Sequence, residues 1–89
     1  MMADVPDYIR AHQHSSRHRR EVMASAFCGC FYCLAVFQPA EITWWIDEEQ
    51  TAMCPRCRID SVIGDASGFA LTAELLTRMK QHWFGVSGD

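Results

Sequence analysis

The stretch that decides the fold reads Cys28-Gly-Cys-Phe-Tyr-Cys33. A second pair, Cys54-Pro-Arg-Cys57, is separated from Cys33 by 20 residues. A gap of two residues lets both sulfurs of one turn reach a single metal ion at about 2.3 Å. Two such turns complete a tetrahedron from protein ligands alone and leave no position open for substrate, which is typical of a structural zinc site. We therefore predict one structural zinc ion per chain. Its predicted ligands are Cys30, Cys33, Cys54 and Cys57.

The residue types leave three alternatives to this assignment. Cys28 can replace Cys30 as a ligand, although the two-residue gap fits better; as a non-ligand it is a small buried apolar residue. An iron–sulfur site can use Cys28 as well. The pair Cys54 and Cys57 also resembles a thiol redox motif, but that motif begins a helix in a βαβ unit, whereas residues 58–63 look extended.

Length, composition and charge restrict the class of protein. The 89 residues allow one domain, and 49% of them are hydrophobic, which argues against disorder. No apolar run approaches the roughly 18 residues of a membrane span, and the polar N-terminus lacks the apolar core of a secretion signal. We therefore expect a cytoplasmic protein with no membrane partner, where thiols stay reduced and clustered cysteines bind metal. The formal net charge is +2 over residues 1–20 and −5 over residues 21–53. Nucleic acid could therefore bind only at a local basic face near the N-terminus.

Short strands are predicted on either side of the cysteine pairs. Their expected ranges are 34–37, 51–53 and 60–64, with a turn over residues 65–68. Pro39 fits the first turn of a brief helix that places Ile42, Trp45 and Ile46 on one side. Because adjacent Trp44 and Trp45 cannot both face the core, we expect one of them to be exposed.

Helices are predicted at both ends. Asp4 can cap a short helix with Pro6 in its first turn, and Ser15 or Ser16 can cap a second helical stretch that runs to about Ser25. The helix near the C-terminus has Thr72 as its N-cap, a staple between Leu71 and Leu76, and Gly85 at its end. Its predicted buried stripe consists of Leu75, Leu76, Met79 and Trp83.

These elements predict an α+β fold, a small zinc-ribbon-like domain whose short β-strands are flanked by N-terminal and C-terminal α-helices. The whole chain, 1–89, is interpreted as a single zinc-binding domain. Within it, residues 1–26 form a helical N-terminal region, residues 27–64 the zinc ribbon and residues 72–84 the C-terminal helix.

The chain resembles a group of small bacterial proteins described only as uncharacterised cytoplasmic proteins. The motifs that carry the resemblance are HSSRHRREV (14–22), CGCFYC (28–33), PAEITWWID (39–47), TAMCPRCRIDSVIG (51–64), SG (67–68) and WF (83–84). The resemblance implies a zinc-ribbon-like domain and leaves the activity open. One departure is Arg58, which stands where a Gly commonly follows such a Cys pair. Either Arg58 occupies a strained left-handed position, or the turn adopts another geometry.

Two functions are compatible with the polar residues. The leading hypothesis is a zinc-binding adaptor that contacts a protein or nucleic acid. Its candidate partner-binding residues are His14, Arg17, His18, Arg19, Arg20, Arg56 and Arg58. The alternative is a small hydrolase-like enzyme in which His14, His18 and Asp60 converge beside the ribbon. Otherwise the two histidines are solvated helix-surface residues, and Asp60 and Ser61 serve as turn residues that bond the local backbone. A purely structural subunit that uses an exposed Trp is a third reading.

Overall fold

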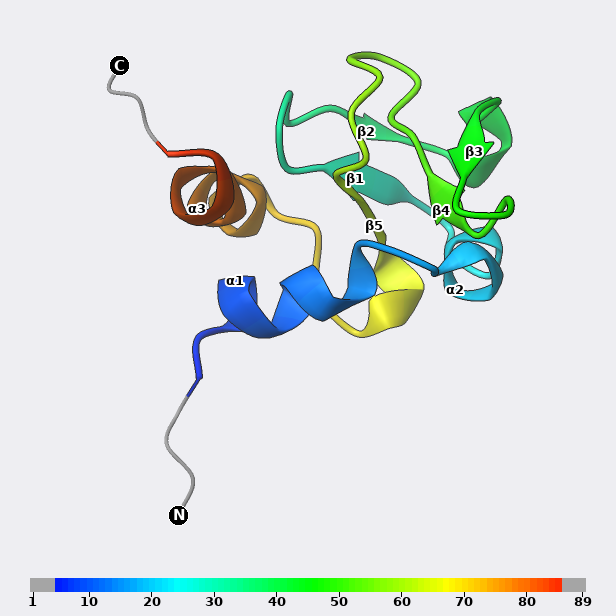
Figure 1. Cartoon of the computed structure of the whole chain (residues 1–89). Coiled ribbons are helices and arrows are strands. Elements are labelled where there is room, and N and C mark those ends of the chain that lie inside the picture. The colour runs from blue at the N-terminus through cyan, green and yellow to red at the C-terminus, as the bar shows by residue number, and fades with distance from the viewer. Residues whose placement is uncertain (1–4, 86–89) are drawn as a thin grey trace.

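The computed structural model describes residues 5–85 and contains two small antiparallel sheets, the smaller of which lies at one edge of the molecule beside α2 (Figure 1). The larger sheet has the strand order β2-β1-β5, with β1 at Cys28–Cys30, β2 at Val36–Phe37 and β5 at Val62–Gly64. The smaller sheet pairs β3 (Trp45–Ile46) with β4 (Thr51–Ala52). Helices precede and follow these short strands along the chain, so the predicted α+β class is confirmed.

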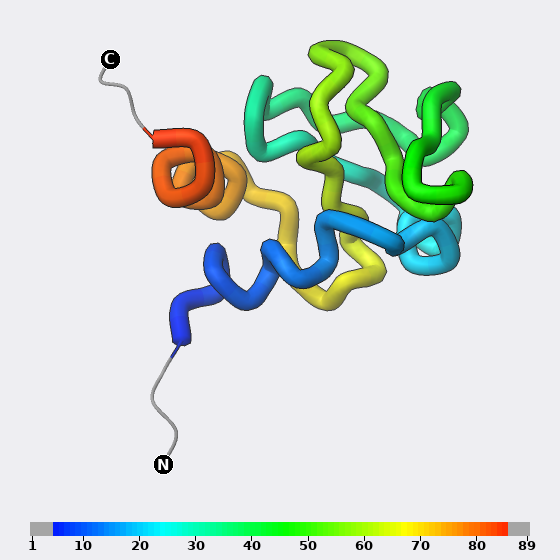
Figure 2. The backbone as a smooth tube through the Cα atoms, viewed as in Figure 1, coloured from blue at the N-terminus to red at the C-terminus, as the bar shows by residue number. Residues whose placement is uncertain are grey.

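Three α-helices and three 3₁₀ turns complete the fold. They are α1 (Asp7–Arg10), η1 (Ala11–His14), α2 (Arg19–Met23), η2 (Pro39–Glu41), η3 (Asp65–Ser67) and α3 (Ala73–Phe84). The helix α1 packs against α3, and the chain then runs on to α2, beside the β3-β4 hairpin (Figures 1 and 2). Within residues 5–85 no helix has the length and apolar character needed to cross a membrane.

The larger sheet separates two hydrophobic cores, because neighbouring side chains on a strand point to opposite faces. The metal-side core consists of Val22, Cys28, Cys30, Phe37, Ile42, Ala52, Cys54 and Val62. The helix-side core consists of Ala11, Phe31, Ile63, Leu75, Leu76 and Met79. Strand β5 contributes to both cores, through Val62 and Ile63, whereas β1 contributes Cys28 and Cys30 to the metal-side core.

Two glycines in the sheet allow helical segments to pack closely. A Cβ atom at Gly29 would lie 3.0 Å from a methyl carbon of Leu76 on α3. A Cβ atom at Gly64 would lie only 2.2 Å from the Oγ atom of Ser25, just after α2. A side chain at Gly64 would therefore collide with Ser25, and one at Gly29 would require the Leu76 side chain to shift.

The N-terminal helices differ from their predicted bounds. The helix α1 begins at Asp7 with Pro6 as its N-cap residue, and Asp4 lies outside the described residues. The prediction that the next helix starts at Ser15 or Ser16 is wrong, because α2 begins at Arg19. Arg17 has a φ of 44°, which no right-handed helix accommodates, and its N–H donates to the Oγ1 atom of Thr51. The hydrogen bond of Arg17 to the distant Thr51 thus makes α2 begin later in the sequence than predicted.

The middle segment also departs from the predicted pattern. The helix at Pro39 is a single 3₁₀ turn that ends at Glu41, so Trp45 and Ile46 do not continue it. They form strand β3 instead, where Trp45 pairs with Ala52. The side chain of Ile42 is buried as expected. The local spacing of apolar residues could not distinguish a helix from a strand here, because the strand forms only by pairing with Ala52 on the later strand β4.

The C-terminal helix agrees with most of its prediction. The hydroxyl of Thr72 accepts the N–H of Leu75 at 3.1 Å, and Gly85 ends α3 with a φ of 77°. Leu75, Leu76 and Met79 are buried. The prediction that Trp83 is buried is wrong: it is 39% exposed, and its ring stacks on that of His12 with 3.8 Å between centroids.

Candidate metal centre

The two cysteine turns share one local geometry. In the first turn, the sulfur of Cys30 accepts N–H groups from Tyr32 at 3.3 Å and Cys33 at 3.4 Å. In the second turn, the sulfur of Cys54 accepts N–H groups from the equivalent residues at 3.3 and 3.4 Å. Each turn is closed by a backbone bond from the residue after its second cysteine to the carbonyl of its first. In both turns, two backbone N–H groups therefore already point at the sulfur of the first cysteine.

The residue that follows each cysteine pair adopts the left-handed conformation. Leu34 and Arg58 both have a φ of 67°. Arg58 therefore occupies the strained left-handed position, the first of the two outcomes expected for it. The left-handed conformation costs a residue with a side chain about 1–2 kcal/mol. Contacts elsewhere in the fold must therefore offset this cost at both Leu34 and Arg58.

The four predicted ligand sulfurs come together in one cluster. The Sγ atoms of Cys30, Cys33, Cys54 and Cys57 all lie within 4.8 Å of one another. The Cys30–Cys57 sulfurs are 3.6 Å apart and the Cys33–Cys54 sulfurs 3.7 Å apart. Four sulfurs placed tetrahedrally at about 2.3 Å from a zinc ion would be about 3.8 Å apart, whereas a disulfide bond measures about 2.05 Å. The cluster therefore fits a metal ion, and all four cysteines are free thiols.

Burial and backbone donors act in opposite directions on these thiols. Desolvation by burial raises the pKa of Cys57 and of Cys33 above the ordinary value. Burial also opposes ionisation of Cys54, but the N–H groups of Cys57 and Arg56 outweigh it and lower the pKa of Cys54. Because a metal binds thiolates, occupation of the cluster must release protons, and its affinity must fall in acid.

Cys28 lies outside the cluster. Its side chain is fully buried in the metal-side core, and burial together with the nearby Asp65 carboxylate raises the pKa of Cys28 to about 12. The geometry thus brings Cys30, not Cys28, to the other three sulfurs. The redox alternative also lacks its expected context, because the next element after Cys57 is strand β5.

A buried hydroxyl completes the surroundings of the cluster. The Oγ atom of Ser61 lies 3.0 Å from the Sγ atom of Cys30. The sequence pattern suggested only turn chemistry for Ser61. Its contact depends on the pairing of β1 with β5, which the local sequence does not encode.

The three residues of the hydrolase hypothesis do not converge. His14 and His18 line one pocket of about 500 Å³, and Asp60 is not among its lining residues. Asp60 is exposed and its charge acts on His12 instead. His14 faces Glu21, with its Nδ1 atom 2.9 Å from the nearer carboxylate oxygen.

His18 is a structural residue and not a solvated one. Its Nδ1–H donates to the carbonyl of His14 at 2.6 Å, and its Nε2 atom accepts the N–H of Ala52 at 3.1 Å. Desolvation by burial lowers the pKa of His18 below its ordinary value, despite the favourable bond to His14. Since both ring nitrogens are occupied, His18 has no lone pair free for a metal or a proton.

The basic residues at the N-terminal side hold the β3-β4 hairpin. Arg17 forms an ion pair with Glu48 at 3.7 Å, and the guanidinium of Arg19 donates to the carbonyl of Glu49 at 2.9 Å and lies over the ring of Trp45. Three consecutive turn residues, 47–49, are left-handed without any glycine. The arginines therefore neutralise and brace a strained acidic turn. Arg20 is exposed and lines the pocket shared by His14 and His18.

The second cysteine turn carries two further arginines. Arg56 pairs with Glu41 at 2.9 Å. The guanidinium of Arg58 lies 5.3 Å from the ring centroid of Trp44, which is 44% exposed. The expectation that one of the adjacent tryptophans is exposed is confirmed.

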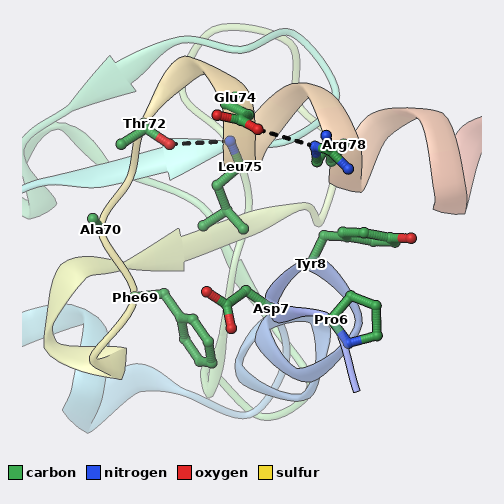
Figure 3. A pocket seen from close by; sticks show the side chains of 9 residues that line it. All are labelled: Pro6, Asp7, Tyr8, Phe69, Ala70, Thr72, Glu74, Leu75 and Arg78. Carbon is green, nitrogen blue, oxygen red and sulfur yellow. Dashed lines mark hydrogen bonds and ion pairs between the residues drawn. The ribbon is translucent and has the colours of Figure 1, made fainter. Parts of the chain in front are cut away.

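A shallow pocket of about 370 Å³ lies between α1 and the start of α3 (Figure 3). Its charged side chains already have partners: Glu74 pairs with Arg78 at 3.3 Å, and Asp7 pairs with Arg10. Thr72 serves as the helix cap. The charged side chains and the helix cap of this pocket are therefore already engaged within the fold.

Exposed aromatic rings gather where α3 ends beside the first cysteine turn, and we call Tyr32, Trp83 and Phe84 the aromatic surface. The rings of Tyr32 and Phe84 meet edge to face at 4.8 Å between centroids. Phe84 is 42% exposed and Tyr32 39% exposed. The ammonium group of Lys80 lies over Tyr32, and both His12 and His82 contact Trp83. Burial and the neighbouring His82 lower the pKa of His12, so Lys80 supplies the positive charge beside these rings. Sequence reasoning assigned Trp83 to the core and so missed this surface.

Comparison with known proteins does not assign the chain to a family: no family model, curated protein or solved structure matches it. The function must therefore be argued from the cysteine cluster and the surfaces around it.

Proposed function

We propose that this chain is a small protein-binding module whose fold is held together by one structural zinc ion at Cys30, Cys33, Cys54 and Cys57. The observation that carries the proposal is the closed set of four sulfurs at zinc-like separations. Four thiolates in a tetrahedron suit zinc or iron among the common metals, and a single tetrahedral ion with no vacant position suits a structural role.

The position of the cluster supports a structural role. Cys30 ends strand β1, and Cys54 follows strand β4 closely, so one ion would tie the larger sheet to the hairpin. Both of these cysteines are buried in the metal-side core. A catalytic zinc needs one position open to water or substrate, and the four cysteines would fill every tetrahedral position.

A protein partner is favoured over nucleic acid by the arrangement of charge. The net charge is −3, and four thiolates around one Zn²⁺ would add about −2 more. Arg17 and Arg19 already contact the turn of the β3-β4 hairpin, and Arg56 already pairs with Glu41 in η2. Binding to phosphates would have to compete with these contacts.

The aromatic surface is the binding surface that this proposal assigns. Tryptophan and tyrosine are enriched at protein interfaces, and large aromatic side chains supply most of the energy at their centres. Lys80 lies over the ring of Tyr32, so the surface complements a segment that carries apolar side chains and a carboxylate. The proposed partner is therefore a protein with such an acidic, apolar segment.

Metal analysis tests the zinc part of the proposal. The chain is purified without added metal, and its intact mass is measured by native mass spectrometry with elemental analysis alongside. One zinc ion per chain and no visible absorption are expected. Iron with visible absorption, or a chain without metal, would contradict the proposal.

Affinity capture under native conditions tests the binding part. The wild-type chain and Trp83→Ser are compared with Phe27→Ser, which removes an exposed ring outside the aromatic surface. We expect the wild type and Phe27→Ser to retain the same protein, and Trp83→Ser to lose it. Retention by all three chains would reject the aromatic surface. Recovery of nucleic acid that is released by moderate salt would show that the partner class is wrong.

A further inference from the structure

We infer that Ser61 belongs to the metal centre: its hydroxyl group donates a hydrogen bond to the thiolate of Cys30 and so holds that sulfur in place for the metal. This inference rests on the proposed zinc site and adds a residue that is not itself a ligand. Ser61 acts on the metal through Cys30, so it is a positioning residue.

The position of Ser61 leaves its hydroxyl group one partner. The residue is 0% exposed, and its Oγ atom lies 3.0 Å from the Sγ atom of Cys30. Its backbone carbonyl accepts the N–H of Phe31, the residue after Cys30, at 3.0 Å. Among residues 5–85 the structure shows no second hydrogen bond to this hydroxyl. Because a buried hydroxyl without a partner is costly, the contact with the sulfur must satisfy it.

The direction of the hydrogen bond follows from the chemistry of the metal. A thiol and a hydroxyl can each donate to the other. A metal-bound cysteine is a thiolate and has no proton to give. Once the metal is bound, the hydroxyl of Ser61 must therefore be the donor and the sulfur of Cys30 the acceptor. Such a bond to a charged acceptor is stronger than one between neutral groups.

Ser61 also makes the two cysteine turns unequal. Cys30 and Cys54 each receive two backbone N–H groups at matching distances, but Cys30 receives the hydroxyl in addition. Four thiolates repel one another around a single divalent ion, and a third donor on Cys30 withdraws some of that negative charge. Removal of such a supporting group costs about 10–100-fold in metal affinity in well-studied metal sites.

The experiment compares three variants with the wild type. Ser61→Ala removes the donor, and Ser61→Thr keeps a hydroxyl at the same position. Ser25→Ala is the matched control, because Ser25 is also buried and its hydroxyl is bonded to backbone groups of Glu21 and Ala66 away from the cluster. Zinc affinity is measured by competition with a chelator of known affinity. Cobalt(II) is substituted for zinc, and its sulfur-to-metal charge-transfer band is recorded.

We expect Ser61→Ala to bind zinc about 10–100-fold more weakly and to shift the charge-transfer band. Ser61→Thr should recover both properties. Ser25→Ala should lower the stability of the fold but leave the band unchanged. Wild-type zinc affinity and an unshifted band in Ser61→Ala would overturn the inference, and so would an equal band shift in Ser25→Ala.

The outcomes separate this inference from the proposed function. A wild-type chain that binds no zinc would overturn the zinc site and the role of Ser61 together. A wild-type chain that binds zinc, beside an unchanged Ser61→Ala, would overturn the role of Ser61 alone. Should Ser61→Ala not fold, NMR on the wild-type zinc form replaces it. A Ser61 hydroxyl proton that exchanges slowly and contacts the β-protons of Cys30 is expected, and a rapidly exchanging proton would contradict the inference.

Discussion

Removal of the metal should unfold the metal-side core first and then the whole domain. Strands β1 and β2 pair through two residues each, β3 and β4 through two, and β1 and β5 through three. Hairpins this short are marginal in water. The metal-side core itself contains Cys30 and Cys54, with Cys57 packed against it, so the proposed metal would stand where apolar packing would otherwise be needed.

The magnitudes support complete loss of structure. A structural zinc ion contributes about 10–16 kcal/mol of binding free energy at neutral pH, whereas the total stability of a folded domain is about 5–15 kcal/mol. The helix-side core contains no predicted ligand, but its Ile63 lies on β5, which pairs with β1 and contributes Val62 to the metal-side core. The helix α3 has 12 residues, a length that is marginal for an isolated helix. It should therefore loosen once the sheet beneath it is lost.

Tryptophan indole signals provide the assay, because the three rings sample different parts of the fold. Trp45 packs against the metal-side core, and Trp83 stacks on His12 near α3. A strong chelator is added while the indole N–H signals and the near-ultraviolet circular dichroism are followed. We expect the signal of Trp45 to collapse first and that of Trp83 to follow, with recovery on addition of zinc. A metal-free chain that kept dispersed signals would show that apolar packing alone specifies the fold and would refute this reasoning.

Three further predictions concern single residues. Cys28→Ser should retain one metal ion per chain by native mass spectrometry, and Cys30→Ser should lose the ion, because the sulfur of Cys30 lies in the cluster and that of Cys28 does not. Gly64→Ala should lower the free energy of unfolding in urea by about 1–3 kcal/mol, because its Cβ atom would lie 2.2 Å from the Oγ atom of Ser25. Burial lowers the pKa of His18, so the stability that it contributes should be complete above its unfolded pKa of about 6.5 and should fall as the pH drops below that value. Urea midpoints between pH 7.5 and 5.5 in excess zinc should therefore decrease less in His18→Gln than in the wild type.

Each of these predictions has an outcome that contradicts it. Loss of metal from Cys28→Ser with full occupancy in Cys30→Ser would reverse the ligand assignment. A Gly64→Ala chain as stable as the wild type would mean that Ser25 can move aside at no cost, despite its bonds to Glu21 and Ala66. Equal pH dependence in the wild type and His18→Gln would show that His18 does not take up its proton on unfolding.

Local signals in the sequence predicted the cysteine cluster and most of α3. The two-residue gaps within the pairs are a property of the chain itself, and so is the Thr72 cap that starts the last helix. These features depend on residues within a few positions of one another. For the same reason the left-handed position of Arg58 could be foreseen from the turn in which it lies.

Long-range contacts decided the features that the sequence analysis missed. The helix expected from Ser15 or Ser16 starts late because Arg17 bonds to Thr51, and Trp45 joins a strand because Ala52 lies opposite it. Trp83 has the spacing of a core residue on α3. Its ring nevertheless stacks on His12, contacts His82 and is 39% exposed.

The sequence by itself therefore determined that this protein carries four cysteines in two turns that could hold one metal ion, between helical ends, in an α+β fold. The tertiary structure alone decided what surrounds them. It buried His18 as a brace for the hairpin, separated His14 from Asp60, brought Ser61 to Cys30 and exposed the aromatic surface. The physical reason is the range of the interactions. Turn geometry and helix caps act over three or four residues, whereas the hydrogen bonds of His18 to Ala52 and of Ser61 to Cys30 join segments that are 30 or more residues apart.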